Sequence, residues 1–182
     1  MYLRGAVRSN LNFCHANLIA LFVMNINELV FVDNFENHVV IMSDVVQLLN
    51  SYRQIHYAST EAGGVLIGER RGQHIVITHI SEPGQDDVRS RTRMVRKGNH
   101  HQQKVNELFE NSDGFLVYLG EWHTHPEDLP QPSNIDIKSW LTGLIATEPM
   151  LMLIVGREGV WLGKKCGNDI KPLKEKAYSH QD

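Results

Sequence analysis

Two histidines and one aspartate are the residues of this sequence best suited by type and spacing to bind a metal ion. His123 and His125 are separated by a single residue in the run GEWHTHP, residues 120–126. In an extended chain, side chains two residues apart project to the same side, so both imidazoles can point at one ion. Asp136 follows after ten intervening residues, enough to bring its carboxylate back to the imidazoles. Two histidine nitrogens and one carboxylate oxygen, with a fourth position left for water, form the ligand pattern of a catalytic zinc site.

A hydrolytic metal centre also needs a proton acceptor and a hydrogen-bond donor, and the sequence offers one candidate for each. Glu61 directly precedes Ala62 and the glycine pair 63–64, where the missing side chains let the backbone approach a neighbouring segment closely. Ser133 stands three residues before Asp136, and its hydroxyl could donate to a carbonyl oxygen as that oxygen becomes negative. The same two residues also suit a capping box at a helix start, a structural interpretation that is compatible with the catalytic one.

A strand and a helix are needed to hold these candidates in place. The apolar run Phe115–Leu119 predicts a central strand that leads into the histidine pair. A helix is predicted from Ser133 to about Thr147, with Asp136 in its first turn. The residues expected to face inward from this helix are Ile135, Trp140, Leu141, Leu144 and Ile145.

The rest of the chain interleaves strands and helices. Helical spacing of apolar residues predicts helices over residues 43–54, capped by Ser43, and 99–112. Hairpin-like pairs of strands alternate with these helices, which predicts one α/β domain, a sandwich with a mixed, mainly antiparallel sheet flanked by helices. Short apolar or alternating runs predict the strands at residues 29–32, 38–41, 65–68, 74–80, 151–155 and 160–162.

Composition and charge favour an ordinary globular protein of about one domain. The 182 residues include 18 Lys and Arg against 21 Asp and Glu, a net charge of −3, and this balance argues against a nucleic-acid binder. The most basic segment, residues 84–98, holds five basic and two acidic side chains and predicts a long exposed loop, which either contacts an acidic partner or is simply solvated. The two cysteines are too few for a disulfide framework or a four-cysteine zinc site.

The chain is expected to divide into one domain, residues 24–165, and two flanking segments. Residues 1–23 are predicted to be a disordered or misassigned extension, with translation starting at Met24, because the periodic sequence begins only there. Residues 166–182 are predicted to be a polar tail. No apolar stretch approaches the roughly 18 residues of a membrane-spanning helix, and no cleavage site follows the short apolar run 18–23, so a cytoplasmic location is predicted.

The combined motifs resemble the JAB/MPN metallopeptidase family and its JAMM active-site signature. That signature has an upstream Glu, then His-Ser/Thr-His-Pro, and seven residues between the second His and a Ser that precedes an Asp by three positions. The same spacing holds here, with residues 126–132 lying between His125 and Ser133. The upstream run EAGGVLIG, residues 61–68, resembles the family's Glu-x-Gly-Gly-x-Leu-x-Gly. The likeness spans about residues 29–162 and implies a JAB/MPN-like fold.

The resemblance also implies a role for each residue of the motif. It implies one catalytic zinc ion held by His123, His125 and Asp136. It implies that Glu61 deprotonates the zinc-bound water and later protonates the leaving amine, and that Ser133 stabilises the oxyanion. The activity that follows is that of a zinc-dependent peptidase or isopeptidase, similar to a deubiquitinase.

A narrower likeness connects the chain with a stand-alone bacterial branch of this family. Residues 120–126, the stretch 89–96 and the pair at 101–102 carry it. Members of this branch occur in integrative elements and in CBASS antiphage operons. The likeness implies a substrate presented as an extended C-terminal tail, namely a cyclic-oligonucleotide synthase released from its conjugates by a cut after its C-terminal residue. The implied partners are that synthase and a ubiquitin-like-conjugation protein of the same operon, and no membrane.

Two other functions are compatible with the same motifs. One is a non-catalytic scaffold or binding module, as in inactive members of the family, which usually lack one or more of the ligands that are all present here. The other is a hydrolase of similar chemistry that acts on a sulfur-carrier conjugate, because the residues that contact the substrate lie outside the motif. A nucleic-acid role would rest only on the arginines of residues 84–98.

Overall fold

The computed structural model describes residues 28–176, which form three helices and eleven strands. The predicted extension 1–23 and the predicted start at Met24 lie outside these residues. The helices are α1 (Ser43–Ser51), α2 (His100–Asn111) and α3 (Asn134–Gly143). The strands are β1 (Leu29–Val32), β2 (His38–Ile41), β3 (Gly63–Arg71), β4 (His74–Ile80), β5 (Val88–Ser90), β6 (Arg93–Val95), β7 (Val117–Thr124), β8 (Met150–Val155), β9 (Val160–Cys166), β10 (Asp169–Pro172) and β11 (Lys174–Glu175).

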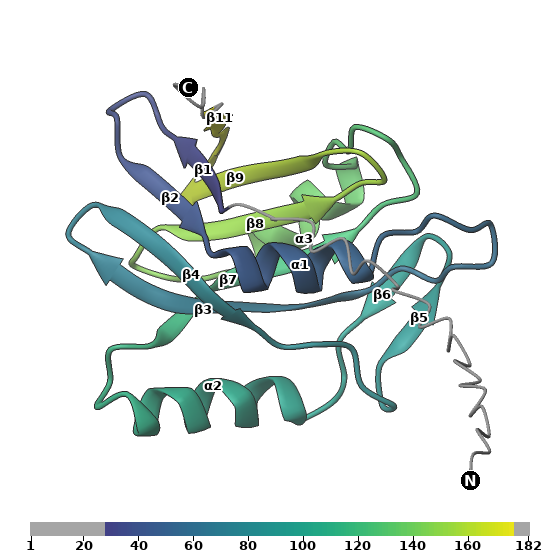
Figure 1. Cartoon of the computed structure of the whole chain (residues 1–182), viewed down its shortest axis with the longest axis horizontal. Helices are drawn as coiled ribbons and strands as arrows, with labels where there is room; N and C mark the ends of the chain where they lie inside the picture. The colour runs from purple at the N-terminus through teal and green to yellow at the C-terminus, as the bar shows by residue number, and fades with distance from the viewer. Residues whose placement is uncertain (1–27, 177–182) are drawn as a thin grey trace, which may run out of the picture.

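Nine of the strands form one sheet in the order β10-β9-β8-β7-β3-β4-β2-β1-β11. Neighbouring strands are antiparallel except for the parallel pairs β2–β4 and β7–β8. Helix α1 lies in front of the sheet and α3 behind it, while α2 runs below the two strands β3 and β7 in Figure 1. The predicted fold class, a mixed and mainly antiparallel sheet flanked by helices, is therefore confirmed. Within the described residues, no helix is long and apolar enough to cross a membrane.

The two faces of the sheet are packed differently. The face under α1 carries the larger core, in which Val45 and Leu49 of the helix meet strand residues such as Leu66 and Trp122. The opposite face carries a smaller core, made of Trp140 and Leu144 with Met152 and Ile154. All six residues of β8 are buried, because both faces of this strand are covered.

A β-bulge interrupts the pairing of β3 with β7. The register between β3 and β7 shifts after the pair Leu66–Gly120, so that Ile67 pairs with Tyr118. Gly120 has φ 151°, and a Cβ atom there would lie 1.9 Å from the carbonyl oxygen of Leu151. Only glycine therefore fits at this position, and the bulge sets which side chains of the following residues face which side of the sheet.

Three sequence expectations outside α3 are wrong in detail. The predicted exposed loop at residues 84–98 contains the hairpin β5–β6, whose two strands pair from Val88–Val95 to Ser90–Arg93. The predicted polar tail from residue 166 instead contributes β10 and β11 to the sheet, and β11 pairs with β1. Residue 42, not Ser43, is the N-cap of α1, and the cap has no side-chain hydrogen bond.

Helix α3 is shorter and less buried than the apolar pattern predicts. It ends at Gly143, four residues before the expected end at Thr147. Trp140 and Leu144 are buried as expected, whereas Ile135 is 79% and Ile145 is 92% exposed. Leu141, also expected inside, is 37% exposed. The helix packs on the small core through one narrow stripe, so the apolar side chains outside that stripe remain in solvent.

Candidate active site

The three predicted metal ligands converge at the end of β7. His123 lies in the strand and His125 directly follows it, while Asp136 is in the first turn of α3. The two histidine Nε2 atoms are 3.0 Å apart. The carboxylate of Asp136 places one oxygen 3.4 Å from His123 Nε2 and the other 3.4 Å from His125 Nε2. Strand and helix therefore bring together the three side chains that the sequence singles out.

The spacing of these atoms fits a tetrahedral metal ion. Zinc bonds to histidine nitrogen and carboxylate oxygen are about 2.0–2.2 Å long, which puts neighbouring tetrahedral ligands about 3.3–3.5 Å from each other. The two nitrogens are 3.0 Å apart, and each lies 3.4 Å from its nearer oxygen of the Asp136 carboxylate, distances close to that range. Burial lowers the pKa of His123, which keeps the imidazole neutral and able to coordinate. The donor set and its geometry therefore suit zinc with one position left for water.

Glu61 lies beside the predicted metal ligands, as the sequence predicts. The next residue, Ala62, accepts the backbone N–H of Thr124 at 2.8 Å and donates its own N–H to the hydroxyl of that threonine at 3.0 Å. Thr124 stands between the two histidines. Gly63 pairs with His123, and a Cβ atom on the glycine would lie 3.2 Å from the Cβ of the histidine. The small residues after Glu61 thus allow the close approach of the two segments.

The carboxyl group of Glu61 has a pKa close to neutral pH. The residue is only 7% exposed. Burial raises its pKa to about 7, with His125 opposing the rise and the carboxylate of Asp136 adding to it. Together with His123 and Asp136 it lines a cavity of about 90 Å³. A carboxyl group with a pKa near 7 can both accept and return a proton at neutral pH.

Ser133 is found in its structural role. Its hydroxyl oxygen accepts the backbone N–H of Asp136 at 3.2 Å, and the carboxylate of Asp136 accepts the backbone N–H of Ser133 at 2.7 Å. This is the capping box that the sequence predicts for the start of α3. The Ser133 side chain also hydrogen-bonds the Asp136 carboxylate and helps to lower its pKa, so the oxyanion role stays a prediction.

The hairpin β5–β6 and the residue that follows it contact the site in ways that sequence reasoning missed. The backbone N–H of Glu61 donates to the carbonyl of Ser90 at 2.7 Å, and Arg89 Nε donates to the carbonyl of Glu61 at 2.7 Å. Arg96 forms an ion pair with Glu121, and both line the same cavity as Glu61. The density of arginines in residues 84–98 was the one signal in the sequence, but it cannot show that these side chains bind the protein's own backbone.

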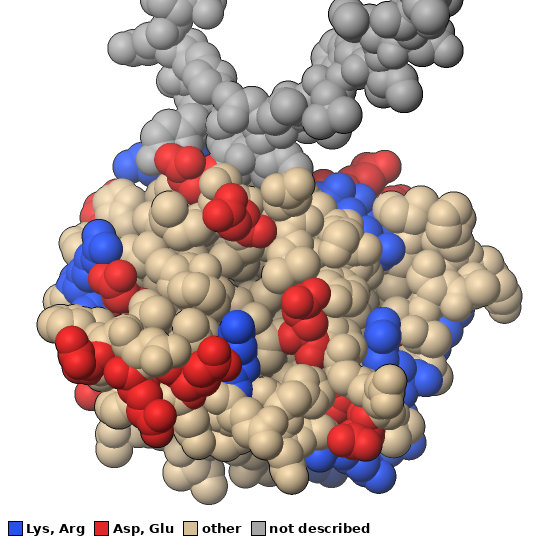
Figure 2. Space-filling view, turned by 60° about the horizontal axis from the view of Figure 1, so that its bottom comes forward, with Lys and Arg blue, Asp and Glu red and all other residues tan. Residues whose placement is uncertain are grey.

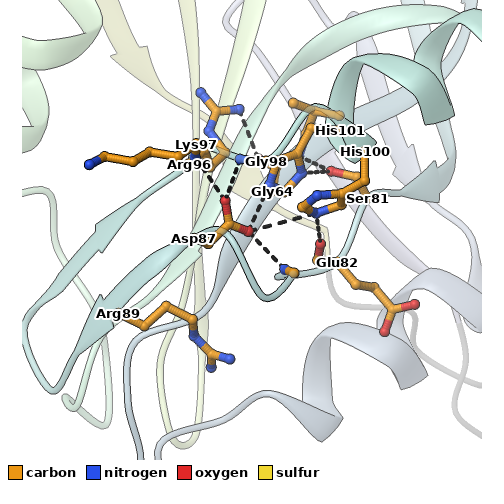
Figure 3. Close-up of polar contacts among 12 residues, drawn as sticks. Gly64, Ser81, Glu82, Asp87, Arg89, Arg96, Lys97, Gly98, His100 and His101 are labelled. Carbon is orange, nitrogen blue, oxygen red and sulfur yellow. Dashed lines mark hydrogen bonds and ion pairs between the residues drawn. The ribbon is translucent and has the colours of Figure 1, made fainter.

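A second group of polar residues, next to the start of α2, resembles a metal site only by residue type. Potential ligand atoms of Asp87, His100 and His101 lie within 4.8 Å of one another. Each ring is already engaged, however: His101 bonds Ser81 Oγ at 2.6 Å and Asp87 Oδ2 at 3.0 Å, and His100 Nε2 contacts the carbonyl of Glu82 at 2.9 Å (Figure 3). The cluster is therefore a hydrogen-bond network that joins the end of β4 to the start of α2.

Asp87 is the centre of this network. Its side chain has no exposed surface. One carboxylate oxygen accepts the backbone N–H groups of Lys97 and Gly98, and the other accepts that of Gly84 (Figure 3). Burial alone would raise the pKa of Asp87, but these hydrogen bonds outweigh it and hold the pKa well below its usual range. The two ends of the segment that contains the hairpin, at Gly84 and at residues 97–98, thereby both hydrogen-bond to one carboxylate.

Asp87→Asn is expected to lower the free energy of unfolding by about 1–3 kcal/mol at pH 7, because an amide offers one acceptor oxygen where the carboxylate uses two. Since the pKa of Asp87 is lower in the folded than in the unfolded chain, its stabilisation is present above the unfolded pKa of about 3.9 and fades as the pH falls below it. Urea unfolding at pH 7 and pH 3 measures both effects. The exposed neighbour change Asp86→Asn is the control, and equal losses in the two variants would contradict the role of Asp87.

Comparison with known proteins assigns the chain to a family. Residues 47–164 match the family model described as prokaryotic homologs of the JAB domain. The chain belongs to this prokaryotic JAB family. The match includes Glu61, both histidines and Asp136, so the resemblance inferred from the motif spacing is confirmed.

Two curated relatives are similar to this JAB protein along most of its length. A protein of Escherichia coli named CD-NTase/cGAS isopeptidase is 74% identical over 156 residues, which cover 86% of this chain and 100% of that protein. A Vibrio cholerae protein of the same name is 59% identical over 138 residues, 76% of this chain and 88% of that one.

More distant similarities concern the fold and the kind of enzyme. A protein of Sinorhizobium fredii named as a probable metalloprotease is 27% identical over 56% of this chain and 66% of its own length. The solution structure of a Desulfitobacterium hafniense protein matches this JAB protein with a TM-score of 0.50 and 19% identity, covering 70% of this chain and 83% of that one. The latter likeness supports the fold alone.

Proposed function

We propose that this JAB protein is a zinc-dependent isopeptidase that cuts after the C-terminal residue of a protein conjugated to an amine. One observation carries the proposal: two histidine nitrogens 3.0 Å apart, each 3.4 Å from an oxygen of the Asp136 carboxylate, lie beside a buried carboxyl group whose pKa is raised to about 7. A ligand set with an open position and an adjacent proton acceptor is what hydrolysis of an amide requires. The family membership and the isopeptidase names of the curated relatives support it.

Each residue of the site has a role in this reaction. His123, His125 and Asp136 would hold the ion, which when bound polarises the scissile carbonyl and lowers the pKa of water toward about 7. Glu61 accepts a proton from the attacking water as the carbon–oxygen bond forms. It then gives the proton to the amine nitrogen as the carbon–nitrogen bond breaks. The Ser133 hydroxyl donates a hydrogen bond to the carbonyl oxygen, which bears the negative charge between these two steps.

The conjugated protein that we propose as substrate is a CD-NTase. The names of the curated relatives, CD-NTase/cGAS isopeptidase, support this class of substrate. The folded synthase would present its C-terminal tail in extended form, joined to an amine such as that of a lysine side chain. In this proposal the enzyme removes the conjugate and serves an antiviral defence system together with a ubiquitin-like-conjugation protein.

The experiment joins metal content to the cleavage product. The purified protein is analysed for zinc and incubated with fusions in which the C-terminal residue of a CD-NTase is linked to a reporter amine. Mass spectrometry then reads the new C-terminus. About one zinc per chain, together with cleavage immediately after the CD-NTase residue, is the expected result. A chain that binds zinc but cuts none of the fusions, at any position, contradicts the isopeptidase function.

The two other functions predict different outcomes of the same experiment. A scaffold binds the conjugate without cutting it, with or without zinc. A hydrolase of sulfur-carrier conjugates cuts a fusion that ends in the tail of a sulfur-carrier protein faster than one that ends in the tail of a CD-NTase. Including a sulfur-carrier fusion in the series therefore separates all three functions.

A further inference from the structure

A second, larger cavity lies beside the catalytic one. This α2 cavity, about 500 Å³ in volume, is bounded by α2, the segment that precedes it, and the strands β3 and β7. Arg96 lines both cavities. Val65 of the α2 cavity is paired with Glu121 of the catalytic cavity in the β3–β7 register. The two cavities are therefore neighbours on the same face of the sheet, joined at one guanidinium group.

The α2 cavity is large enough for a stretch of polypeptide. Cavities of about 300–1,000 Å³ enclose ligands of drug size, and its volume lies within that range. An isopeptidase substrate has an acyl part and an amine part on the two sides of the scissile bond. In a lysine conjugate, the amine part next to that bond is only the unbranched lysine side chain. The acyl side brings the successive side chains of an extended tail, spaced about 3.3 Å per residue. Of the two, the acyl-side tail needs a cavity of this size next to the scissile bond.

The lining of the α2 cavity favours an anionic ligand. Among the described residues that form it, none is acidic, whereas Arg96 and Lys97 are basic and Asn99 and Gln102 carry amide donors. Lys97 is exposed and binds Asp87 only through its backbone N–H, so its ammonium extends away from that carboxylate (Figure 3). In Figure 2, basic side chains gather on the right, where the hairpin lies in Figure 1, and acidic ones at the lower left.

The wall of the α2 cavity is held in place before any ligand arrives. The backbone N–H groups of Lys97 and Gly98 are fixed by Asp87, and His101, which also lines the cavity, is bonded on both ring nitrogens. Arg96 is fixed by its ion pair with Glu121 and by a bond to the carbonyl of Gly64. A preorganised wall lowers the entropic cost of binding and makes a sequence preference possible.

We propose that the α2 cavity binds the acyl-side tail of the substrate and selects a tail that carries an acidic side chain within the last few residues before the scissile bond. This inference rests on the proposed isopeptidase function and adds the determinant of its specificity. Lys97 is the residue that recognises the acid, because the guanidinium of Arg96 is already paired with Glu121. The basic stretch of residues 84–98 thereby has a role that neither the metal chemistry nor the fold requires.

The test uses tails that differ in one charge. Fusions with Glu or Lys placed singly at the second to sixth residue before the scissile bond are compared by kcat/KM. At one or two of these positions the wild-type enzyme is expected to prefer Glu about two- to fivefold, the usual strength of an exposed charge pair. The preference is expected to shrink at 1 M salt, where the screening length falls to about 3 Å. Equal rates for Glu and Lys at all five positions overturn the proposal.

Lys97→Glu is the decisive variant. Lys97 is exposed, so the change leaves the fold intact, and the Glu-to-Lys preference is expected to fall below one. Lys104→Glu makes the same charge change in α2 outside the α2 cavity, and the wild-type preference is expected to persist. Equal effects of the two variants would show that net charge, not the cavity, sets the preference.

Binding of labelled tail peptides provides a readout that does not need cleavage. Fluorescence anisotropy of peptides with a Glu or a Lys, which end in the free carboxylate of the product, should show the same two- to fivefold difference and its inversion in Lys97→Glu. A binding preference without any cleavage would contradict the proposed function but not the α2 cavity. Cleavage without any preference would contradict the α2 cavity alone.

Discussion

Glu61→Gln is expected to lower kcat/KM by at least about 10²–10⁴-fold while the zinc content stays at the wild-type level. General acid–base catalysis contributes about that much, and here one carboxyl group serves both in the attack of water and in the departure of the amine. The proposed metal ligands are three other side chains, so metal binding is not expected to depend on Glu61. Single-turnover kinetics and elemental analysis of the same preparation measure the two quantities together.

The stability of the Glu61→Gln variant is the control on this result. Burial raises the pKa of the carboxyl group above its ordinary value, so the ionised form destabilises the folded, metal-free chain at pH 8. A neutral amide of the same size removes that effect, and the free energy of unfolding should stay equal or increase. The exposed change Glu107→Gln should leave both activity and stability unchanged. An active Glu61→Gln enzyme would exclude Glu61 as the base.

Loss of the metal is expected to abolish activity, and two changes at one position separate the metal from the fold. Asp136→Asn removes the charged ligand but keeps an oxygen that can accept the backbone N–H of Ser133. Asp136→Ala removes both the ligand and the capping bond. Zinc content and kcat/KM should collapse in both variants. The alanine variant should lose about 0.5–2 kcal/mol more unfolding free energy than the asparagine variant, the usual effect of a lost helix cap.

Chelation of the wild-type enzyme completes this comparison. Removing zinc should abolish cleavage, and adding it back should restore activity to the wild-type chain but not to Asp136→Asn. Unfolding is measured on metal-free samples, so that the stabilisation by bound metal does not mask the capping effect. Full activity in Asp136→Asn would remove the aspartate from the ligand set, and full activity after exhaustive chelation would exclude a metallopeptidase.

The sequence predicts the centre of this site well because its determinants are local. Alternation along a strand places His123 and His125 on one side, and a capping box fixes Asp136 in the first turn of α3. Each rule acts over a few residues, so spacing alone carries the information. The glycine pattern after Glu61 is similarly local. It predicts that this segment lies close to another part of the backbone, but it does not identify that part.

The parts that the sequence does not predict depend on long-range contacts. Arg89 bonds the backbone of a residue 28 positions away, and no periodicity encodes such a bond. Ile135 and Ile145 fit the apolar pattern of a buried helix but are exposed, because the core beneath α3 is too narrow to cover them. The strand β11 is only two residues long. It pairs with β1, from the opposite end of the described chain, and local composition cannot predict such a long-range pairing.

The hairpin β5–β6 links recognition and chemistry in a way that matters for the divergence and engineering of these enzymes. It holds the backbone of the proposed base through Ser90 and Arg89, and the chain continues directly from it to Arg96 at the junction of the two cavities. If the proposed preference holds, exchanging the hairpin together with residues 96 and 97 between related enzymes is expected to change substrate preference and turnover in the same step. Specificity in this scaffold is not a module that can be swapped independently, and new preferences should evolve by single changes such as those at Lys97.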